Sequence, residues 1–122
     1  MGLDMYALTT PHALPAAVDF DGPAENQQLH YWRKHPDLHG WFRALYESKG
    51  GANPDFNLAP VALDRGDLDA LETAVKTGGL PRTEGFFFGE SYGSERAGDL
   101  AFIGKAREAI AAGLAVYYLA WW

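Results

Sequence analysis

The sequence predicts an α+β domain in which a small, four-stranded, mainly antiparallel sheet packs with about four helices. First, short segments with strand periodicity and longer segments with helical periodicity both occur. Second, glycine and proline residues separate these segments. Third, 48% of the 122 residues are apolar, enough to bury a core as a single domain over residues 1–122. The alternation of strands and helices would also fit an α/β domain with parallel strand pairs.

The first half of the chain begins with a strand and continues with two helices. Residues 3–10 alternate between apolar and other side chains, which predicts a strand with one apolar face. Three prolines and a glycine indicate a loop over residues 11–23. A short helix with a thin apolar face is expected at 24–34. Pro36 then starts a second helix over 36–48, whose stripe of Leu38, Trp41, Phe42 and Leu45 is the clearest helical pattern in the chain.

The middle of the chain predicts a short strand followed by a helix. Residues 58–63 form the strand, and Pro60 places it at an edge or an end of the sheet. Asp64 is expected to cap the next helix, with Asp67 near its positive end, and Gly78 with Gly79 to end it. On the exposed side of this helix, Glu72 and Lys76 have the spacing of a favourable ion pair.

The last part of the chain predicts two strands and one helix. Residues 85–89, GFFFG, are apolar on both sides, which is typical of a strand covered on both faces. A helix rich in small residues is expected over 99–112. Residues 114–122, LAVYYLAWW, again read as a strand that is apolar on both faces.

Composition and charge exclude several classes of protein. The chain has no cysteine, so it has no disulfide bond, no thiolate nucleophile and no cysteine ligand for zinc. The net charge of −6 makes general nucleic-acid binding unfavourable. We see no secretory signal and no apolar stretch long enough to cross a bilayer. We therefore expect a cytoplasmic protein without membrane contact.

Three segments resemble parts of a set of small, uncharacterised proteins from phages and bacterial genomes. They are MGLDMY at the start, YWRK at 31–34 followed by His39 with Trp41 and Phe42, and GFFFG at 85–89. The resemblance implies a phage or prophage setting and a bacterial cytoplasm. It implies no activity and no site residues.

The histidine-rich stretch from residue 30 to 42 raises the question of a metal site. His35 and His39 have the spacing that puts two imidazoles on one helical face. Pro36 spoils this arrangement because it leaves His35 ahead of the helix, and no glutamate follows His35 as the metalloprotease pattern requires. We therefore expect no metal ligand and no cofactor.

The same stretch suggests a ligand-binding site. The candidate residues are Asp4, Tyr6, Trp32, Arg33, Lys34 and His39. Arg33 would clamp an anion or a phosphate, or else it pairs internally with Asp4. His39 would act as an acid or base with a tuned pKa, or else it is a histidine bonded to a backbone carbonyl.

The glycine-rich segment after residue 88 does not predict catalysis. It lacks the lysine of a P-loop. We do not expect Ser91 or Ser94 to be a nucleophile, and we assign no catalytic residue. Enzymatic activity is not the favoured interpretation.

The aromatic C-terminal strand indicates a protein contact. Trp121 and Trp122 at a chain end make sense when they are buried in the domain or in a partner, so a homodimer through this strand competes with a fully internal strand. Our main hypothesis is a phage-type accessory protein that is not an enzyme and acts by protein–protein contact, for example as an inhibitor of a host defence system. The alternative is a small-molecule, nucleotide or phosphate binding protein, or an enzyme, with a pocket around Arg33 and His39.

Overall fold

Four antiparallel strands form one sheet in the order β2-β1-β4-β3 in the computed structural model, which describes residues 2–84, 89, 91 and 94–122. The strands are β1 (Asp4–Thr10), β2 (Gln27–Arg33), β3 (Val61–Leu63) and β4 (Ala115–Trp121). The helices in the described part of the chain are α1 (Pro36–Ser48), α2 (Arg65–Thr77) and α3 (Arg96–Ala111). The predicted α+β class and antiparallel sheet are confirmed, with three described helices in place of about four.

The strand β2 corrects the prediction of a helix over residues 24–34. Gln27–Arg33 pairs with β1 instead, with Tyr31 opposite Tyr6 and Arg33 opposite Asp4. Successive residues of β2 point to opposite faces, so Trp32 is buried while Tyr31 is exposed. The thin helical stripe in this segment buries little surface, and pairing with β1, interrupted only by a register shift between Ala7 and Leu8, outweighs it. The predicted strand at 85–89 lies, apart from Gly89, outside the described residues.

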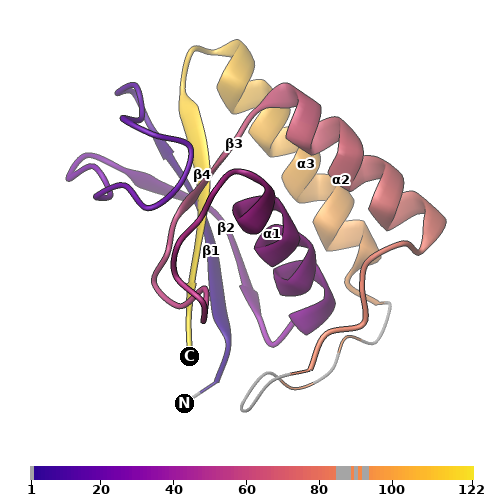
Figure 1. The fold of residues 1–122 in the computed structure, drawn as a ribbon. Helices are drawn as coiled ribbons and strands as arrows, with labels where there is room; N and C mark the ends of the chain where they lie inside the picture. The colour runs from indigo at the N-terminus through magenta and orange to yellow at the C-terminus, as the bar shows by residue number, and fades with distance from the viewer. Residues whose placement is uncertain (1, 85–88, 90, 92–93) are drawn as a thin grey trace.

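The first and the last strands of the chain lie side by side in the middle of the sheet. β4 runs antiparallel to β1 along its whole length, from Asp4 opposite Trp121 to Thr10 opposite Ala115. Both described ends of the chain therefore lie at the same end of the sheet, as Figure 1 shows. β2 and β3 form the two edges.

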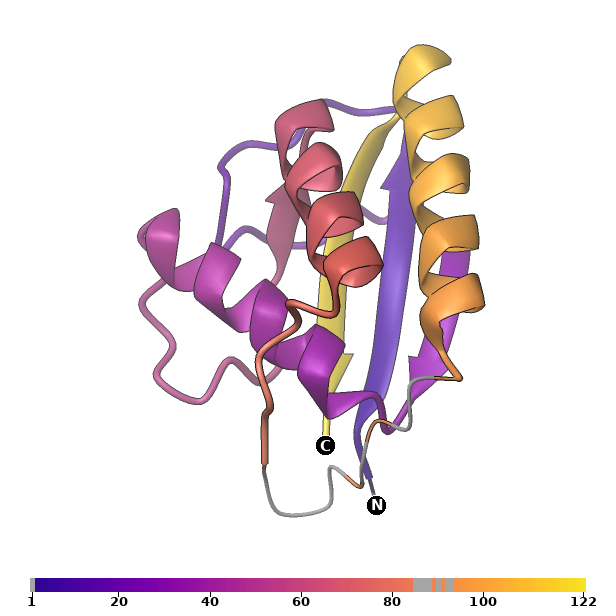
Figure 2. The same ribbon diagram turned by 90° about the vertical axis from the view of Figure 1, so that its right-hand side faces the viewer.

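All three described helices cover the same face of the sheet (Figures 1 and 2). The core between them and the sheet contains Met5 from β1, Phe42 from α1, Phe102 from α3 and Tyr118 from β4. The rings of Phe42 and Tyr118 stack with centroids 3.9 Å apart. None of the helices in the described part of the chain is long and apolar enough to span a bilayer.

Local sequence signals fix where the helices begin and end. The predicted cap of α2 is confirmed, because Asp64 and Asp67 form a reciprocal capping box, and Gly78 ends the helix in the left-handed conformation. The predicted pair of Glu72 and Lys76 is present with a separation of 3.7 Å. α3 begins at Arg96, three residues before the predicted start at residue 99.

Gly40 in α1 allows the segment that follows α2 to pack closely against α1. A Cβ atom at this position would lie 1.8 Å from Thr83 Oγ1 and 2.9 Å from Thr83 Cβ. The segment around Thr83 is therefore packed directly on the backbone of α1. A glycine in a helix interior costs about 1 kcal/mol relative to alanine, and this close approach explains its presence.

Candidate binding face

Three aromatic residues gather on the sheet face that the helices leave uncovered. Tyr6 in β1, Tyr31 in β2 and Trp121 in β4 form what we call the aromatic patch. Tyr6 stacks on Trp121 with centroids 4.6 Å apart and contacts Tyr31 at 5.1 Å. Tyr31 is 41% exposed and Trp121 40% exposed, whereas Tyr6 between them is half-buried. The patch is thus a continuous aromatic surface across three strands.

The strand register explains why these side chains meet. Tyr6 lies opposite Tyr31, and Trp121 lies opposite Asp4, the residue two places before Tyr6 in β1. Side chains at such diagonal positions on one face of a sheet are within reach when they are aromatic. At the other end of this face, Phe20 from the loop after β1 packs edge-on against Tyr117, with centroids 5.4 Å apart. The loop therefore covers that end and leaves the patch accessible.

A charged pair borders the aromatic patch. Asp4 Oδ1 lies 3.5 Å from Arg33 Nε and accepts a hydrogen bond of 2.6 Å from the Tyr31 hydroxyl. Of the two alternatives for Arg33, the internal pairing with Asp4 is the one that the structure contains. The pair makes this border nearly neutral, although the chain as a whole carries a net charge of −6.

The tyrosine hydroxyls of the patch stay protonated at neutral pH. The hydrogen bond to the Asp4 carboxylate raises the pKa of Tyr31 to about 12, because ionisation would put two negative charges side by side. Burial raises the pKa of Tyr6, and the Asp4 charge adds to this effect. Both phenols therefore present O–H groups, with the Tyr31 proton directed to Asp4.

Of the predicted ligand-binding residues, the structure brings Asp4, Tyr6 and Arg33 together on the open face. Lys34 follows them in an exposed turn before α1, with a left-handed φ of 56°. Trp32 points to the opposite face, where its indole N–H donates to Asp99. That side chain is part of the core rather than of the patch.

His39 also lies on the helix side of the sheet and not with Asp4 and Arg33. It is 1% exposed, although its place at the border of the apolar stripe suggests a half-buried side chain. Its Nδ1 is 2.7 Å from the Tyr118 hydroxyl, and its ring stacks on Phe56 and meets Trp122 edge-on. Burial and, to a lesser extent, the nearby Arg43 charge together lower the pKa of His39 to about 4.

Tyr31 and Trp121 belong to the aromatic patch but were not among the predicted ligand-binding residues, although Trp121 was expected to be buried in the domain or at a protein contact. The signal for Tyr31 is the alternation of residues 27–33, which places Tyr31 and Arg33 on one side once the segment is taken as a strand. The position of Trp121 depends on the pairing of β4 with β1, which no local pattern reveals. Within the described residues, no group of three or more histidine or acidic side chains is arranged to hold a metal ion.

The chain matches no protein family model, and no curated protein and no solved structure is significantly similar to it.

Proposed function

We propose that this domain acts by protein–protein contact and that the aromatic patch is its contact surface. The observation that carries the proposal is the exposure of Tyr31 and Trp121 on either side of Tyr6, on a sheet face without a covering helix. Large aromatic side chains supply much of the binding energy at protein interfaces, because they bury a large area and lose little conformational entropy. An exposed aromatic cluster on a monomer is typical of such surfaces.

The charge distribution indicates the kind of partner. The ion pair of Asp4 with Arg33 leaves the border of the patch nearly neutral, so apolar contact there meets little repulsion. The net charge of −6 attracts a partner whose surface is positively charged around its own apolar contact. We therefore favour a basic partner protein.

The resemblance of three segments to phage and prophage proteins is the basis on which we propose a setting for this function. We propose that the domain works in the bacterial cytoplasm as a phage-type accessory protein, with inhibition of a host defence system as the working hypothesis. A homodimer is the second arrangement. It would use the side chains of β4, Trp121 above all, because the backbone of β4 already pairs with β1 and β3.

The alternative of one pocket around Arg33 and His39 gains no support from these positions. Arg33 pairs with Asp4 on the open face, whereas His39 bonds to Tyr118 on the face covered by helices. A thermal-shift screen of phosphate and nucleotides tests it directly, because a ligand that binds the folded state raises the midpoint of unfolding. A shift that Arg33→Ala removes would revive the alternative.

The contact proposal is tested with a patch variant, Tyr31→Ser with Trp121→Ser. The matched control is Leu58→Ser, which removes a 62% exposed apolar side chain that is not part of the patch but lies near it, since the Leu58 N–H donates to the carbonyl of Ala120 in β4. Each protein is immobilised, bacterial lysate is passed over it, and the retained proteins are identified. The isolated partner is then titrated at increasing salt.

We expect one basic protein to bind the wild type and the control but not the patch variant, with an association rate that falls as salt increases. A homodimer would instead appear in light scattering as a doubled mass that only the patch variant loses. Equal retention of the same proteins by all three, with a monomeric mass throughout, would refute the proposal.

A further inference from the structure

A serine, a histidine and an aspartate form a hydrogen-bonded chain on the helix side of the molecule, away from the aromatic patch. Ser91 Oγ lies 2.6 Å from His35 Nδ1, and His35 Nε2 lies 2.8 Å from Asp99 Oδ2. His35 is 3% exposed and Asp99 1% exposed, while Ser91 is half-buried. This is the order of contacts in which a serine nucleophile, its base and an orienting carboxylate are arranged in acyl-transfer enzymes.

The neighbouring hydrogen bonds fix where the protons are. The indole N–H of Trp32 donates to Asp99 Oδ1 at 3.0 Å, so both carboxylate oxygens are occupied and the group is held in one orientation. A carboxylate only accepts, so His35 Nε2 carries the proton between them. Nδ1 then has a lone pair, which accepts the Ser91 O–H. Compared with the usual triad, the two imidazole nitrogens have exchanged places, which does not alter the proton transfer.

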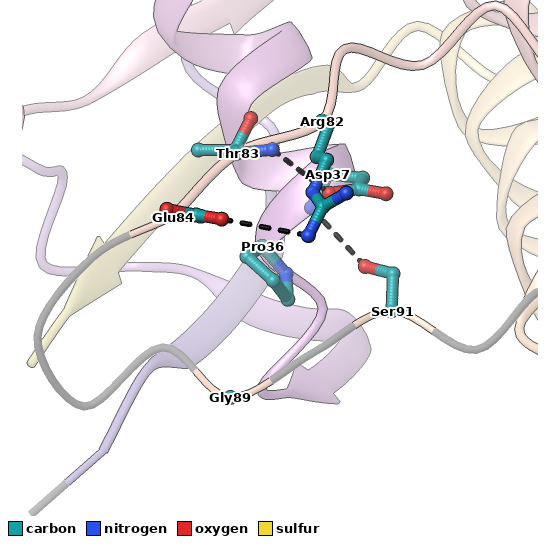
Figure 3. A pocket seen from close by; sticks show the side chains of 7 residues that line it. All are labelled: Pro36, Asp37, Arg82, Thr83, Glu84, Gly89 and Ser91. Atoms are coloured by element: carbon teal, nitrogen blue, oxygen red, sulfur yellow. Dashed lines mark hydrogen bonds and ion pairs between the residues drawn. The ribbon is translucent and has the colours of Figure 1, made fainter.

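The start of α1 lies next to the serine oxygen. The backbone N–H of Asp37 donates to Ser91 Oγ at 3.1 Å, as the dashed line in Figure 3 marks. Ser91 therefore accepts one hydrogen bond and donates the other to His35. The first turn of a helix presents N–H groups and a partial positive charge, which stabilise a negative charge that develops on oxygen.

Two hollows meet at Ser91 and Asp37. The first, about 490 Å³ in volume and drawn in Figure 3, is bordered by the Thr83 segment. The second, about 310 Å³, lies on the His35 side and has Val75 and Leu80 in its wall. A small molecule therefore has room on both sides of the serine oxygen, with an apolar wall on one side only.

Two acidic side chains lie close to the His35 imidazole, which would become a cation during such a reaction. Glu95 Oε2 lies 3.5 Å from His35 Nδ1, and Asp99 holds the opposite nitrogen. Asp37 and Arg96 also border the smaller hollow. Two carboxylates therefore lie within 3.5 Å of this imidazole, next to the positive charge that it would carry after it receives the serine proton.

The glycines on either side of Ser91 match a pattern that often surrounds a nucleophilic serine, in a segment for which no catalytic residue was expected. Gly89 and Gly93 flank Ser91 at the G-x-S-x-G spacing found around the nucleophile of many serine hydrolases. The pattern alone is weak evidence. Its weight comes from the independent contacts of Ser91 with His35 and of His35 with Asp99.

We propose that Ser91 is the nucleophile of a hydrolytic site for small carboxylic esters with a short apolar acyl group, with His35 as base and Asp99 as the residue that positions it. Ser91 Oγ adds to the ester carbonyl carbon while its proton passes to His35 Nδ1. The carbonyl electron pair moves onto the carbonyl oxygen, which gives a tetrahedral intermediate. When this electron pair returns, the bond from carbon to the alcohol oxygen breaks, and His35 gives its proton to that oxygen.

The second half-reaction uses water as co-reactant. A water molecule gives a proton to His35 Nδ1 as its oxygen adds to the acyl carbon. The bond from that carbon to Ser91 Oγ breaks, Oγ takes the proton back, and the carboxylic acid leaves. The sum is ester plus water to acid plus alcohol, and the protein ends as it began.

The test combines a fluorophosphonate probe, which reacts with activated serines, with hydrolysis of 4-nitrophenyl butyrate. The variants are Ser91→Ala and, as matched control, Ser94→Ala, which removes an exposed hydroxyl in the same segment. We expect peptide mass spectrometry to find the label on Ser91 of the wild-type protein. We expect kcat/KM to fall by at least about 100-fold in Ser91→Ala and to stay unchanged in Ser94→Ala.

The role of Asp99 has its own readout. The amide of Asp99→Asn can hold His35 in the other tautomer, so this variant should lower kcat by about 10-fold or more while KM changes little. A variant that merely loosened the fold would lower its melting temperature and raise KM. The proposal is overturned if folded wild-type protein is not labelled at Ser91, or if both serine variants hydrolyse the ester as fast as the wild type. Neither result depends on the aromatic patch.

Discussion

His35 and His39 are four residues apart at the start of α1, and both are buried, yet their surroundings differ completely. His35 bonds to a carboxylate on α3 and to a serine hydroxyl. His39 lies among aromatic rings and bonds to the Tyr118 hydroxyl of β4. One imidazole therefore lies between a hydroxyl and a carboxylate, whereas the other is held neutral among aromatic rings, with its pKa lowered by burial to about 4.

Pro36 produces this difference. It starts α1 and leaves His35 ahead of the helix, so the two rings do not share one helical face. His35 consequently reaches toward α3, while His39, inside the first turns of α1, points into the core between α1 and β4. Four predictions, from the largest expected effect to the smallest, test whether the two histidines depend on their partners in these different ways.

Removal of the Asp99 carboxylate should lower the free energy of unfolding more than any of the other three changes. Asp99→Ala leaves two buried donors, the Trp32 indole N–H and the His35 imidazole N–H, without their acceptor. We expect the free energy of unfolding to fall by about 3–5 kcal/mol, measured by urea denaturation. Glu108→Ala, an exposed acid on the same helix, is the control and should change it by less than about 0.5 kcal/mol. Equal losses would mean that Asp99 has no special place in the core.

Lowering the pH should reduce the free energy of unfolding through protonation of His39. Its folded-state pKa of about 4 lies below the unfolded value near 6.5, so the unfolded chain takes up the proton first. The stability from this residue is complete above pH 6.5 and is lost as the pH falls toward 4, by up to about 3 kcal/mol. His39→Gln, which does not titrate, should flatten this part of the curve of unfolding free energy against pH. Parallel curves for the two proteins would contradict the assignment.

Loss of the Tyr118 hydroxyl, which bonds to His39, should lower the free energy of unfolding less than loss of the Asp99 carboxylate, which bonds to His35. Tyr118→Phe keeps the ring stacked on Phe42 but leaves a buried imidazole nitrogen without its partner. We expect a loss of about 1–3 kcal/mol by chemical denaturation. The neighbouring change Tyr117→Phe, on the other face of β4, is the control and should cost less. A larger loss at Tyr117 would show that the His39 contact contributes little.

Ser91→Ala should lower the free energy of unfolding least. Ser91 is half-buried, so water can replace its bonds to His35 and to the Asp37 N–H. We expect a loss below about 1 kcal/mol, seen as a small shift of the thermal midpoint. A loss as large as that of Asp99→Ala would identify Ser91 chiefly as a tether of its own segment to α1.

The elements that local patterns determine were predictable. The helix α1, the capping box of α2 and the alternation of β1 each depend on residues close together in the chain. The pairing of Asp4 with Arg33 was one of two alternatives that the sequence offered for Arg33, and it depended on the face of Asp4 in the first strand, because the segment of Arg33 was taken for a helix. β2 was missed because its local pattern fits a helix about as well as a strand, and only pairing with β1 decides between them.

Local sequence patterns could not predict the contacts between segments that are far apart in the chain. His35 meets Ser91 and Asp99 across 56 and 64 residues of sequence. Periodicity shows which side of a helix is apolar, but not which helix a polar side chain will meet. For this reason the sequence alone paired His35 only with its neighbour His39 and indicated no role for Asp99.

The central position of β1 and β4 has a consequence for folding in the cell. During synthesis β1 leaves the ribosome well before β4, the strand that pairs with it along its whole length. α1 and α2 can form as they emerge, whereas the sheet stays open along its middle until β4 arrives, and the apolar inner side of β1 needs protection during that interval. Without β4, β3 would have no strand pairing that links it to β1 and β2, so β4 is the element that joins the two edges of the sheet.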